Sequence, residues 1–557
     1  MTQRIIKPKK DTPSAQGALL TRRRHAYPEH TAIVFGIIML TIFPLLVGPG
    51  GYTNITEFKY NAFVVFTILF LVAAMLALLA FVLDKKARAE RLADGLQRLS
   101  LPQILLIGFM LSTSVSAIMT PYQYNVWVGQ GRYEGLLSVL LYGAIFLLLS
   151  FWGEYTDWYI YGLCGAMILF VLLGLPQLSG ANPLSLYPDN AATYSTYQFF
   201  STAGNVDMVA GFVALALPAI ASAYVLLEGK KRYILCLPAF ALLLFTQLIV
   251  DVDSGKMGIL AATIILLPLL FVNRRRIRRC LHIAALACFV FSLHSLFPYT
   301  NYAFGFAPGK KVWVFLGLSV IFLGLAFLQR LYKKELPISA KTIRIVLIII
   351  LAVILIAGLI FVYQYTGENR LLTEFSGFLH GEIVDHAGSG RGYVWKKSVE
   401  LIQEGGAFGS GPDSFRTRFE PFNEEYNAIM GSSVYFDYAH NDFLQIGVNY
   451  GPVGLGLYVA FLLSLAVRAF RVSERNPMVI LFIASATGYL VHSFFSFSIA
   501  IVTPMFWVIA GLLDKCIRQT TPKAAAETDG MGKKAPAPED KSSPAVSPIQ
   551  GKKKHHP

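Results

Sequence analysis

The residues best suited to chemistry stand in the stretch "YAHND", which leads from a polar segment directly into an apolar run. An imidazole can be neutral or charged near neutral pH, so His440 is a residue that could do chemistry where the polar segment meets the apolar run. The same stretch also fits the N-terminus of a helix, where Asn441 or Asp442 accepts hydrogen bonds from backbone N–H groups. The local sequence leaves both interpretations open.

Three basic residues stand at positions where a polar segment meets a predicted helix. They are Arg132 in "VGQGRYEGLL", Lys256 in "DVDSGKMGIL" and Arg391 in "GSGRGYVW". Each one alone fits an interfacial cation whose aliphatic stem lies along apolar surface. Together they would surround one anionic group, because a guanidinium offers a planar fork of donors that matches phosphate oxygens. A glycan carried on a membrane diphosphate is such a ligand.

Two further patterns carry less weight. Asp251 and Asp253 form an Asp-x-Asp pair, which suggests a nucleotide sugar with a divalent metal, but local ion pairing with Lys256 explains the pair equally well. Asn54 and Thr56 form an Asn-x-Thr acceptor pattern to which we assign no function. No cluster of Cys, His and carboxylates has convincing ligand spacing, so we predict neither a metal nor another cofactor.

The elements that must position these residues are membrane helices. Of the 557 residues, 55% are hydrophobic and only 15% are charged, which is far from the balance of a soluble domain. Apolar runs of about 20 residues, long enough to cross a bilayer, recur along the chain. Spans are predicted at 31–48, 61–83, 102–119, 135–151, 157–175, 206–227, 232–250, 254–272, 280–297, 312–329, 345–363, 453–470, 478–495 and 496–514. The chain is therefore predicted to be an all-α polytopic membrane protein with about 12–14 transmembrane helices.

Basic residues in the loops predict the orientation. The segments "KPKK", "TRRR", "DKKARAER", "EGKKR", "NRRRIRR" and "QRLYKK" fall on one side when the spans alternate, and that side is expected to be cytoplasmic. The net charge of +15 is then explained by topology and by contact with anionic membrane lipids, so no nucleic-acid partner is predicted. All five cysteines lie in spans or on the cytoplasmic side, which argues against a disulfide framework.

The predicted organisation has five parts. They are a cytoplasmic basic N-terminus (1–30) with no apparent cleavable signal peptide, transmembrane helices with an external loop at 176–205 (31–364), a large extracytoplasmic loop (365–440), C-terminal transmembrane helices (441–514) and a disordered cytoplasmic tail (515–557). In the large loop, Val394, Val399, Leu401 and Ile402 with charges between them predict a short amphipathic helix. Glycines from Gly405 onward end it.

The large loop carries a family resemblance. The order "SGRGYVWKKSVELIQEGGAFGSGPDSF" followed by "YAHNDFLQIGVNYGPVGLGLYV" resembles the O-antigen ligase and polymerase superfamily, with its Arg-x-x-x-Trp opening, Gly-x-Gly turn and His-Asn-x-x-Leu-x signature. The matching positions are Arg391, Trp395, Gly409, Gly411, His440, Asn441, Leu444 and Gln445. Where the family usually has arginine soon after a serine, this chain has Ser254, Gly255 and Lys256, so the bidentate fork is lost there.

The resemblance implies a GT-C-like glycosyltransferase in the bacterial cytoplasmic (inner) membrane, with its active site facing the periplasm. It would move a glycan from undecaprenyl diphosphate to an acceptor hydroxyl with inversion. His440 would be the general base, and Arg391, with Arg132 and Lys256, would stabilise the diphosphate. Asn441 would orient His440 or bind sugar. Tyr438 and Trp395 would stack on a sugar ring, unless they belong to an interfacial aromatic belt.

Several alternatives remain open at this stage. A ligase and a polymerase differ only in the acceptor, which is a different lipid, glycan or cell-wall polymer for the ligase and another lipid-linked repeat for the polymerase. The large loop near the end favours the ligase. A protein-glycosylating relative lacks support, because no appended domain for a protein acceptor is evident. A lipid-linked glycan flippase or exporter is expected to place ionisable residues near mid-span, whereas here they gather at the external boundary.

Overall fold

The computed structural model describes residues 26–84, 99–187, 199–300, 303–331, 339–382, 385–388, 390–431 and 433–520. Most of the predicted N-terminal part (1–30), the basic run that follows Asp84, the lysines after Leu331, part of the predicted loop 176–205 and the tail from residue 521 lie outside the described residues.

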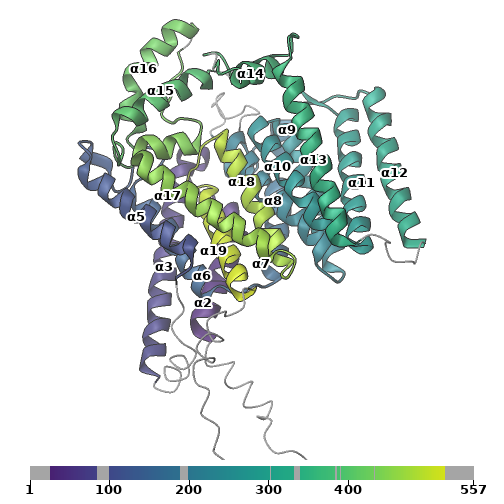
Figure 1. Cartoon of the computed structure of the whole chain (residues 1–557), viewed down its shortest axis with the longest axis horizontal. Coiled ribbons are helices and arrows are strands. Elements are labelled where there is room, and N and C mark those ends of the chain that lie inside the picture. Colours follow the sequence, from purple (N-terminus) through teal and green to yellow (C-terminus); the bar gives the residue numbers. More distant parts are fainter. Residues whose placement is uncertain are drawn as a thin grey trace, which may run out of the picture. The chain divides into compact units, whose positions relative to one another are not determined.

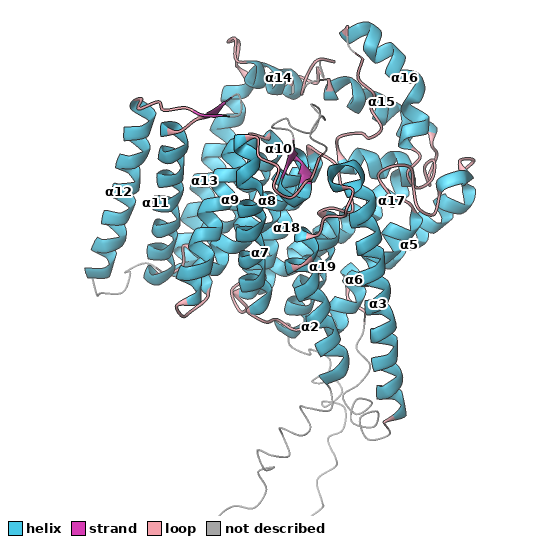
Figure 2. Cartoon of the chain, turned by 180° about the vertical axis from the view of Figure 1, so that it is seen from behind, coloured by secondary structure: helices cyan, strands magenta, loops and turns pink. Residues whose placement is uncertain are grey.

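The described chain is built from helices (Figures 1 and 2). They are α2 (Ala26–Thr41), α3 (Ile55–Leu83), α5 (Leu101–Met119), α6 (Leu136–Trp152), α7 (Trp158–Gly174), α8 (Val206–Leu226), α9 (Leu237–Val250), α10 (Asp253–Leu270), α11 (Arg274–Leu296), α12 (Lys310–Leu331), α13 (Ala340–Tyr363), α14 (Arg370–Leu379), α15 (Arg391–Glu404), α16 (Phe415–Met430), α17 (Asp442–Val472), α18 (Met478–Phe494) and α19 (Thr503–Thr520). Two short hairpins, β1–β2 (Phe199–Phe200 with Gly204–Asn205) and β3–β4 (Tyr299–Thr300 with Ala303–Phe304), are the strands of the described part.

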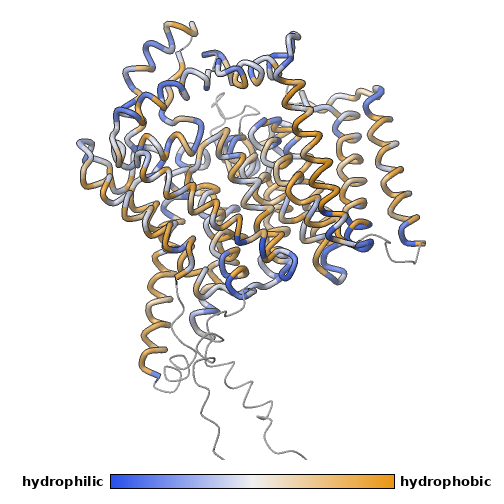
Figure 3. Tube along the Cα trace, viewed as in Figure 1, coloured by the Kyte–Doolittle hydropathy of each residue, from blue (hydrophilic) through white to orange (hydrophobic). Residues whose placement is uncertain are grey.

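The prediction of an all-α polytopic membrane protein is confirmed. Among the described residues, eleven helical segments are long and apolar enough to cross a membrane, and α6 and α18 are shorter apolar helices. Apolar residues run along α12 and α13 between their ends (Figure 3), and α13 has no buried residue, as expected of a helix whose sides contact lipid. By contrast, α8 is buried along most of its length and packs against α9, α10 and α18.

The helices of the large loop, α14, α15 and α16, lie at one end of the helix bundle (Figure 1). At the start of α11, Arg279 donates to Glu228 at 2.9 Å and Arg275 pairs with the same carboxylate. These pairs join α11 to the turn that follows α8. The orientation of the bundle in the membrane stays a prediction.

The last predicted spans can be compared with the structure. The span predicted from 453 matches the second part of α17, because α17 is broken at Gly451, whose φ of 67° lies in the left-handed region; the turns from Asp442 precede that break. The break has a local cause, because Pro452 lacks a backbone N–H and disfavours helical geometry in the residue before it. The last helix begins at Thr503, so residues 496–502 of the predicted span 496–514 are a turn.

Candidate functional site

The histidine at the end of the large loop is held by the start of α17. The Asn441 side-chain oxygen accepts hydrogen bonds from the backbone N–H groups of Phe443 and Leu444, each at 3.0 Å, so Asn441 is the N-cap of α17. His440, directly before the cap, has a φ of 49°. A left-handed conformation in a residue other than glycine stores strain that the surroundings must hold. The capping interpretation and a site at His440 are therefore compatible.

The His440 imidazole lies between two aromatic rings. The centres of the Phe436 and Phe497 rings are 5.8 and 5.4 Å from that of the imidazole, both edge-on. Its Nδ1 is buried and has no hydrogen-bond partner among the described residues. Burial, and then the charges of Arg391 and Arg132, lower the pKa of His440 to about 3. The imidazole is consequently neutral near pH 7, which is the form that accepts a proton.

Arg391 is the first residue of α15, as the sequence predicts. The preceding Gly390 has a φ of 91°, which glycine adopts without a Cβ clash. The Arg391 Nη1 donates to the carbonyl oxygen of Phe495 at 2.7 Å. Phe495 begins the segment 495–502, here called the α18–α19 connection, so Arg391 joins the large loop to the last two helices.

Trp395 lies one turn after Arg391 on the same face of α15. Its Nε1 donates to the carbonyl oxygen of Ala439 at 3.1 Å, and its half-buried ring packs against Phe494 and Phe495. Because Ala439 directly precedes the candidate base, Trp395 fixes the position of that histidine.

Arg132, from the loop before α6, reaches the same place. Its Nε and Nη2 donate to the two carboxylate oxygens of Asp437 at 3.0 and 2.6 Å. Burial alone would raise the pKa of Asp437, but the hydrogen bond and the charge of Arg132, with smaller contributions from a backbone hydrogen bond and His440, together hold that pKa below its usual value. The Arg132 guanidinium also lies over the Phe497 ring, 4.2 Å from its centre, and 5.5 Å from that of Tyr438. Arg132 and Arg391 thus meet the α18–α19 connection from two sides.

The third predicted cation lies in a separate cluster. The Lys256 amine is 2.6 Å from an Asp251 oxygen and 2.8 Å from an Asp253 oxygen, within the α9–α10 turn. Among the described residues it has no contact with Arg132, Arg391 or His440. The local ion pairing that the sequence suggested for this Asp-x-Asp pair is what the structure shows.

The Gly-x-Gly turn fastens the large loop to α17. The backbone N–H groups of Ser410 and Gly411 donate to the carbonyl oxygens of Val448 and Asn449, at 3.1 and 2.9 Å. Gly409 has a φ of 72°, and a Cβ there would collide with backbone atoms of Asn449 and of the α17 break. Only glycine permits this close approach of two backbones.

Asp413, just after that turn, joins it to the Arg132 loop. Its carboxylate accepts the backbone N–H of Gln130. Burial raises the pKa of Asp413 to about 7, against the opposing effects of that hydrogen bond and of Arg132. The turn, the loop before α6 and the start of α17 are therefore one connected unit.

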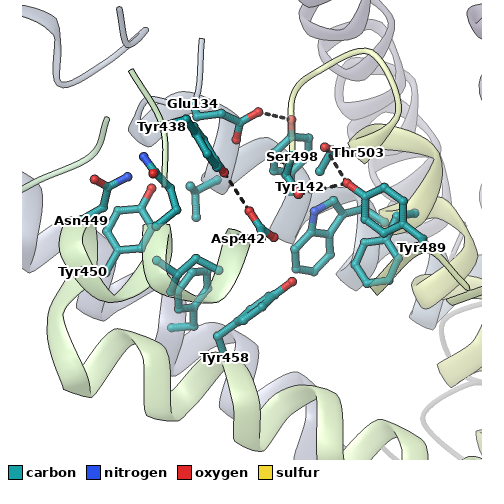
Figure 4. A pocket seen from close by; sticks show the side chains of 16 residues that line it. Glu134, Tyr142, Tyr438, Asp442, Asn449, Tyr450, Tyr458, Tyr489, Ser498 and Thr503 are labelled. Carbon is teal, nitrogen blue, oxygen red and sulfur yellow. Dashed lines mark hydrogen bonds between the residues drawn. The ribbon is translucent and has the colours of Figure 1, made fainter. Parts of the chain in front are cut away.

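Tyr438 is buried, and its hydroxyl donates to Asp442 at 2.8 Å. Its ring is consequently closed to a sugar in this conformation and instead supports Arg132. On its other side lies a cavity of about 60 Å³ (Figure 4).

Sequence reasoning missed several residues of the site. Asp437, Phe497 and the carbonyl of Phe495 contact the candidate residues, and Asp207 at the start of α8 lies within electrostatic range of both arginines. One signal was available: "HSFFSFS" (492–498) places a histidine and three serines inside an apolar run. Such a polar interruption is unusual for a lipid-facing span.

Comparison with known families agrees with this geometry. Residues 302–459 match the family model described as O-antigen ligase. The matched segment is similar to the O-antigen ligase and polymerase superfamily. The ligase match includes Arg391, Trp395 and His440, whereas Arg132 and the α18–α19 connection lie outside it. No curated protein matches the chain. The ligase match and the apolar helices of the described part together support a multi-pass membrane protein, and the match supports glycan transfer of the ligase or polymerase type.

Proposed function

We propose that the chain transfers a glycan from undecaprenyl diphosphate to an acceptor hydroxyl at the outer face of the bacterial cytoplasmic membrane, with inversion. The observation that supports this most directly is His440, which has a left-handed backbone, directly precedes α17 and lies within electrostatic range of Arg391 and Arg132. A base beside two cations suits a reaction in which a hydroxyl loses a proton while a diphosphate gains charge.

In the proposed reaction, the acceptor oxygen attacks the anomeric carbon of the donor sugar as His440 takes the hydroxyl proton. The bond between that carbon and the bridging phosphate oxygen breaks, and the electron pair leaves with the lipid diphosphate. Arg391 and Arg132 stabilise the new negative charge, because charge-assisted hydrogen bonds strengthen as charge develops. Asp437 keeps Arg132 in place before the donor arrives.

The other predicted residues take supporting roles. Asn441 and Trp395 position the chain on either side of His440, through the α17 cap and the bond to Ala439. The Tyr438 ring packs against the Arg132 guanidinium. Lys256 remains outside the proposed diphosphate site, because its ion pairs with Asp251 and Asp253 lie in the separate α9–α10 turn. The diphosphate site is proposed to work without a metal ion bound to the phosphates.

The transfer assay uses purified full chain in nanodiscs with an undecaprenyl-diphosphate-linked glycan, a lipid acceptor, excess EDTA and neither ATP nor nucleotide sugar. We expect glycan attached to the acceptor, as a ligase requires. Lengthening of the lipid-linked glycan without attachment would identify a polymerase. Activity that appears only after Mg²⁺ or Mn²⁺ is added would overturn the metal-free proposal, and unchanged donor in every condition would overturn glycan transfer itself.

The proposed orientation places the large loop outside the cell. Ser410 is buried, so a cysteine at this position would be a poor reporter of topology. Ser433 is exposed in the segment before α17. We expect a membrane-impermeant maleimide to label Ser433→Cys in intact spheroplasts, above the background of the native cysteines. Labelling only after the membrane is opened would reverse the orientation.

A further inference from the structure

The cavity at Tyr438 adjoins the proposed transfer site and shares this tyrosine with it. Side chains from α5, α6, α17, α18 and α19, from the segments before α6 and α17, and from the α18–α19 connection line it (Figure 4). A cavity of about 60 Å³ has room for a few waters or a small ion with water. It is too small for a sugar ring, so its occupant is not the glycan.

Two carboxylates line this cavity. Glu134 accepts a hydrogen bond from Tyr142 at 3.1 Å, and Asp442 accepts one from Tyr438 at 2.8 Å. The described residues that line the cavity include no Lys, Arg or His. Burial, and then the charge of Asp442, raise the pKa of Glu134 well above its usual value, so the ionised form of this pair needs a cation as its counter-charge.

A second observation points to an occupant. Gln445 lines the cavity with 3% of its surface exposed, and its buried Nε2 has no hydrogen-bond partner in the part of the chain that the structure describes. The amide cannot simply be turned over, because its Oε1 accepts the backbone N–H of Ala439 at 3.0 Å. A water can accept a hydrogen bond from Nε2 and direct its other lone pair at a cation.

The polar groups around the cavity are rich in oxygen. The Tyr489 hydroxyl lies 3.1 Å from the Ser498 hydroxyl and 2.9 Å from that of Thr503, and all three side chains line the cavity with the carboxylates. Carboxylates, hydroxyls and water suit hard cations. Calcium takes six to eight oxygens and magnesium gives up its waters reluctantly. Two carboxylates in a small cavity favour an ion that is easier to dehydrate.

We propose that this cavity binds one sodium ion between the carboxylates of Glu134 and Asp442, with water held by Gln445. Glu134 comes two residues after Arg132, and Asp442 comes two residues after His440. The ion therefore joins the segment that carries the proposed diphosphate ligand to the segment that carries the proposed base. This role in transfer rests on the proposed function, whereas the binding of sodium does not.

The test is thermal unfolding of the purified full chain in detergent at constant ionic strength. Sodium chloride replaces choline chloride stepwise, and lithium, potassium and calcium chlorides are compared. We expect a saturable, sodium-specific rise in Tm of about 2 °C or more, because an ion that binds only the folded state stabilises it. Glu134→Gln and Asp442→Asn should lose the response. Glu420→Gln removes an exposed carboxylate and should keep it.

The outcomes separate the ion site from the transfer reaction. His440→Asn, inactive under the proposed function, should keep the full sodium response because the cavity is intact. A sodium response in a wild-type protein that transfers no glycan would overturn the proposed function and leave the site standing. An equal effect of all salts, a calcium-specific effect, stabilisation by acid alone, or a full response in both carboxylate variants would overturn the site. If these variants do not fold, the wild-type ion series decides.

Discussion

The two ends of α17 carry two buried polar clusters that behave differently. Near its C-terminal end, Asp514 is fully buried and accepts hydrogen bonds from Arg468, Ser150 and Ser100, at 2.9, 2.5 and 3.3 Å. At its N-terminal end, His440 has a left-handed backbone and a buried nitrogen without a partner. A purely structural cluster satisfies its polar atoms, whereas an atom left unsatisfied at a strained residue is available to a ligand.

The largest effect is expected from breaking the hydrogen-bonded cluster around Asp514. Arg468→Ala should lower the free energy of unfolding by about 3 kcal/mol, the lower end for breaking a buried ion pair, because two serines still donate to Asp514. Reversible denaturation in mixed micelles measures it. Arg471→Ala, at an exposed position of the same helix, is the matched control and should change little. If Arg468→Ala has the stability of the wild type, a structural role for this cluster is contradicted. The folded fraction of Arg468→Ala should bind the donor with wild-type affinity.

The next largest effect is expected from replacing His440 at the N-terminal end of α17. His440→Asn should reduce turnover about 10²-fold or more, the scale of general base catalysis, with donor affinity largely kept. Asparagine is preferred to alanine here because it tolerates the left-handed backbone better. Turnover and donor binding are measured separately on protein shown to be folded and inserted. Normal turnover in this variant would end the proposed mechanism.

Substitutions of Arg391 test whether the site at the N-terminal end of α17 binds the diphosphate. Arg391→Ala should weaken donor binding about tenfold or more and lower turnover, since a hydrogen bond to a charged group is lost. Arg391→Lys should recover only part, because the guanidinium fork is gone. Lys396→Ala, on an exposed side of the same helix, is the control for general charge loss. Donor affinity and turnover both at wild-type values in Arg391→Ala would exclude it from the site.

The smallest expected effect is a change of activity with pH, which tests the lowered pKa of His440. A histidine whose pKa is lowered to about 3 stays neutral as pH falls from 7 to 5, so kcat/KM should change less than about twofold through this group. An ordinary histidine would lose about tenfold near pH 5.5. Asp413, with its pKa raised to about 7, is one other group of the described residues expected to titrate in this range. An inflection that remains in Asp413→Asn and follows a pKa near 6.5 would contradict the lowered pKa of His440.

Much of the fold was predictable from the sequence, because bilayer thickness sets the length of a membrane-spanning helix. Such a helix is one continuous apolar run, which can be read directly from neighbouring residues. The helix opened by Arg391, the glycines that end it and the cap at Asn441 were predictable for a similar reason, since each depends on neighbours a few residues away. The boundary error in residues 496–502 arose because hydropathy does not detect a turn whose residues are largely apolar.

The sequence by itself thus determined the membrane class, the large loop and the pairing of Arg391 with His440 in one motif. Only the tertiary structure decided that Arg132 meets Asp437, 305 residues away, that Lys256 pairs locally instead, and that Glu134 and Asp442 face one cavity. The physical reason is that periodicity and spacing describe contacts within an element. The packing of the helices decides which distant side chains share a buried space. Because that space excludes water, it also decides which protonation state of a buried side chain is favoured.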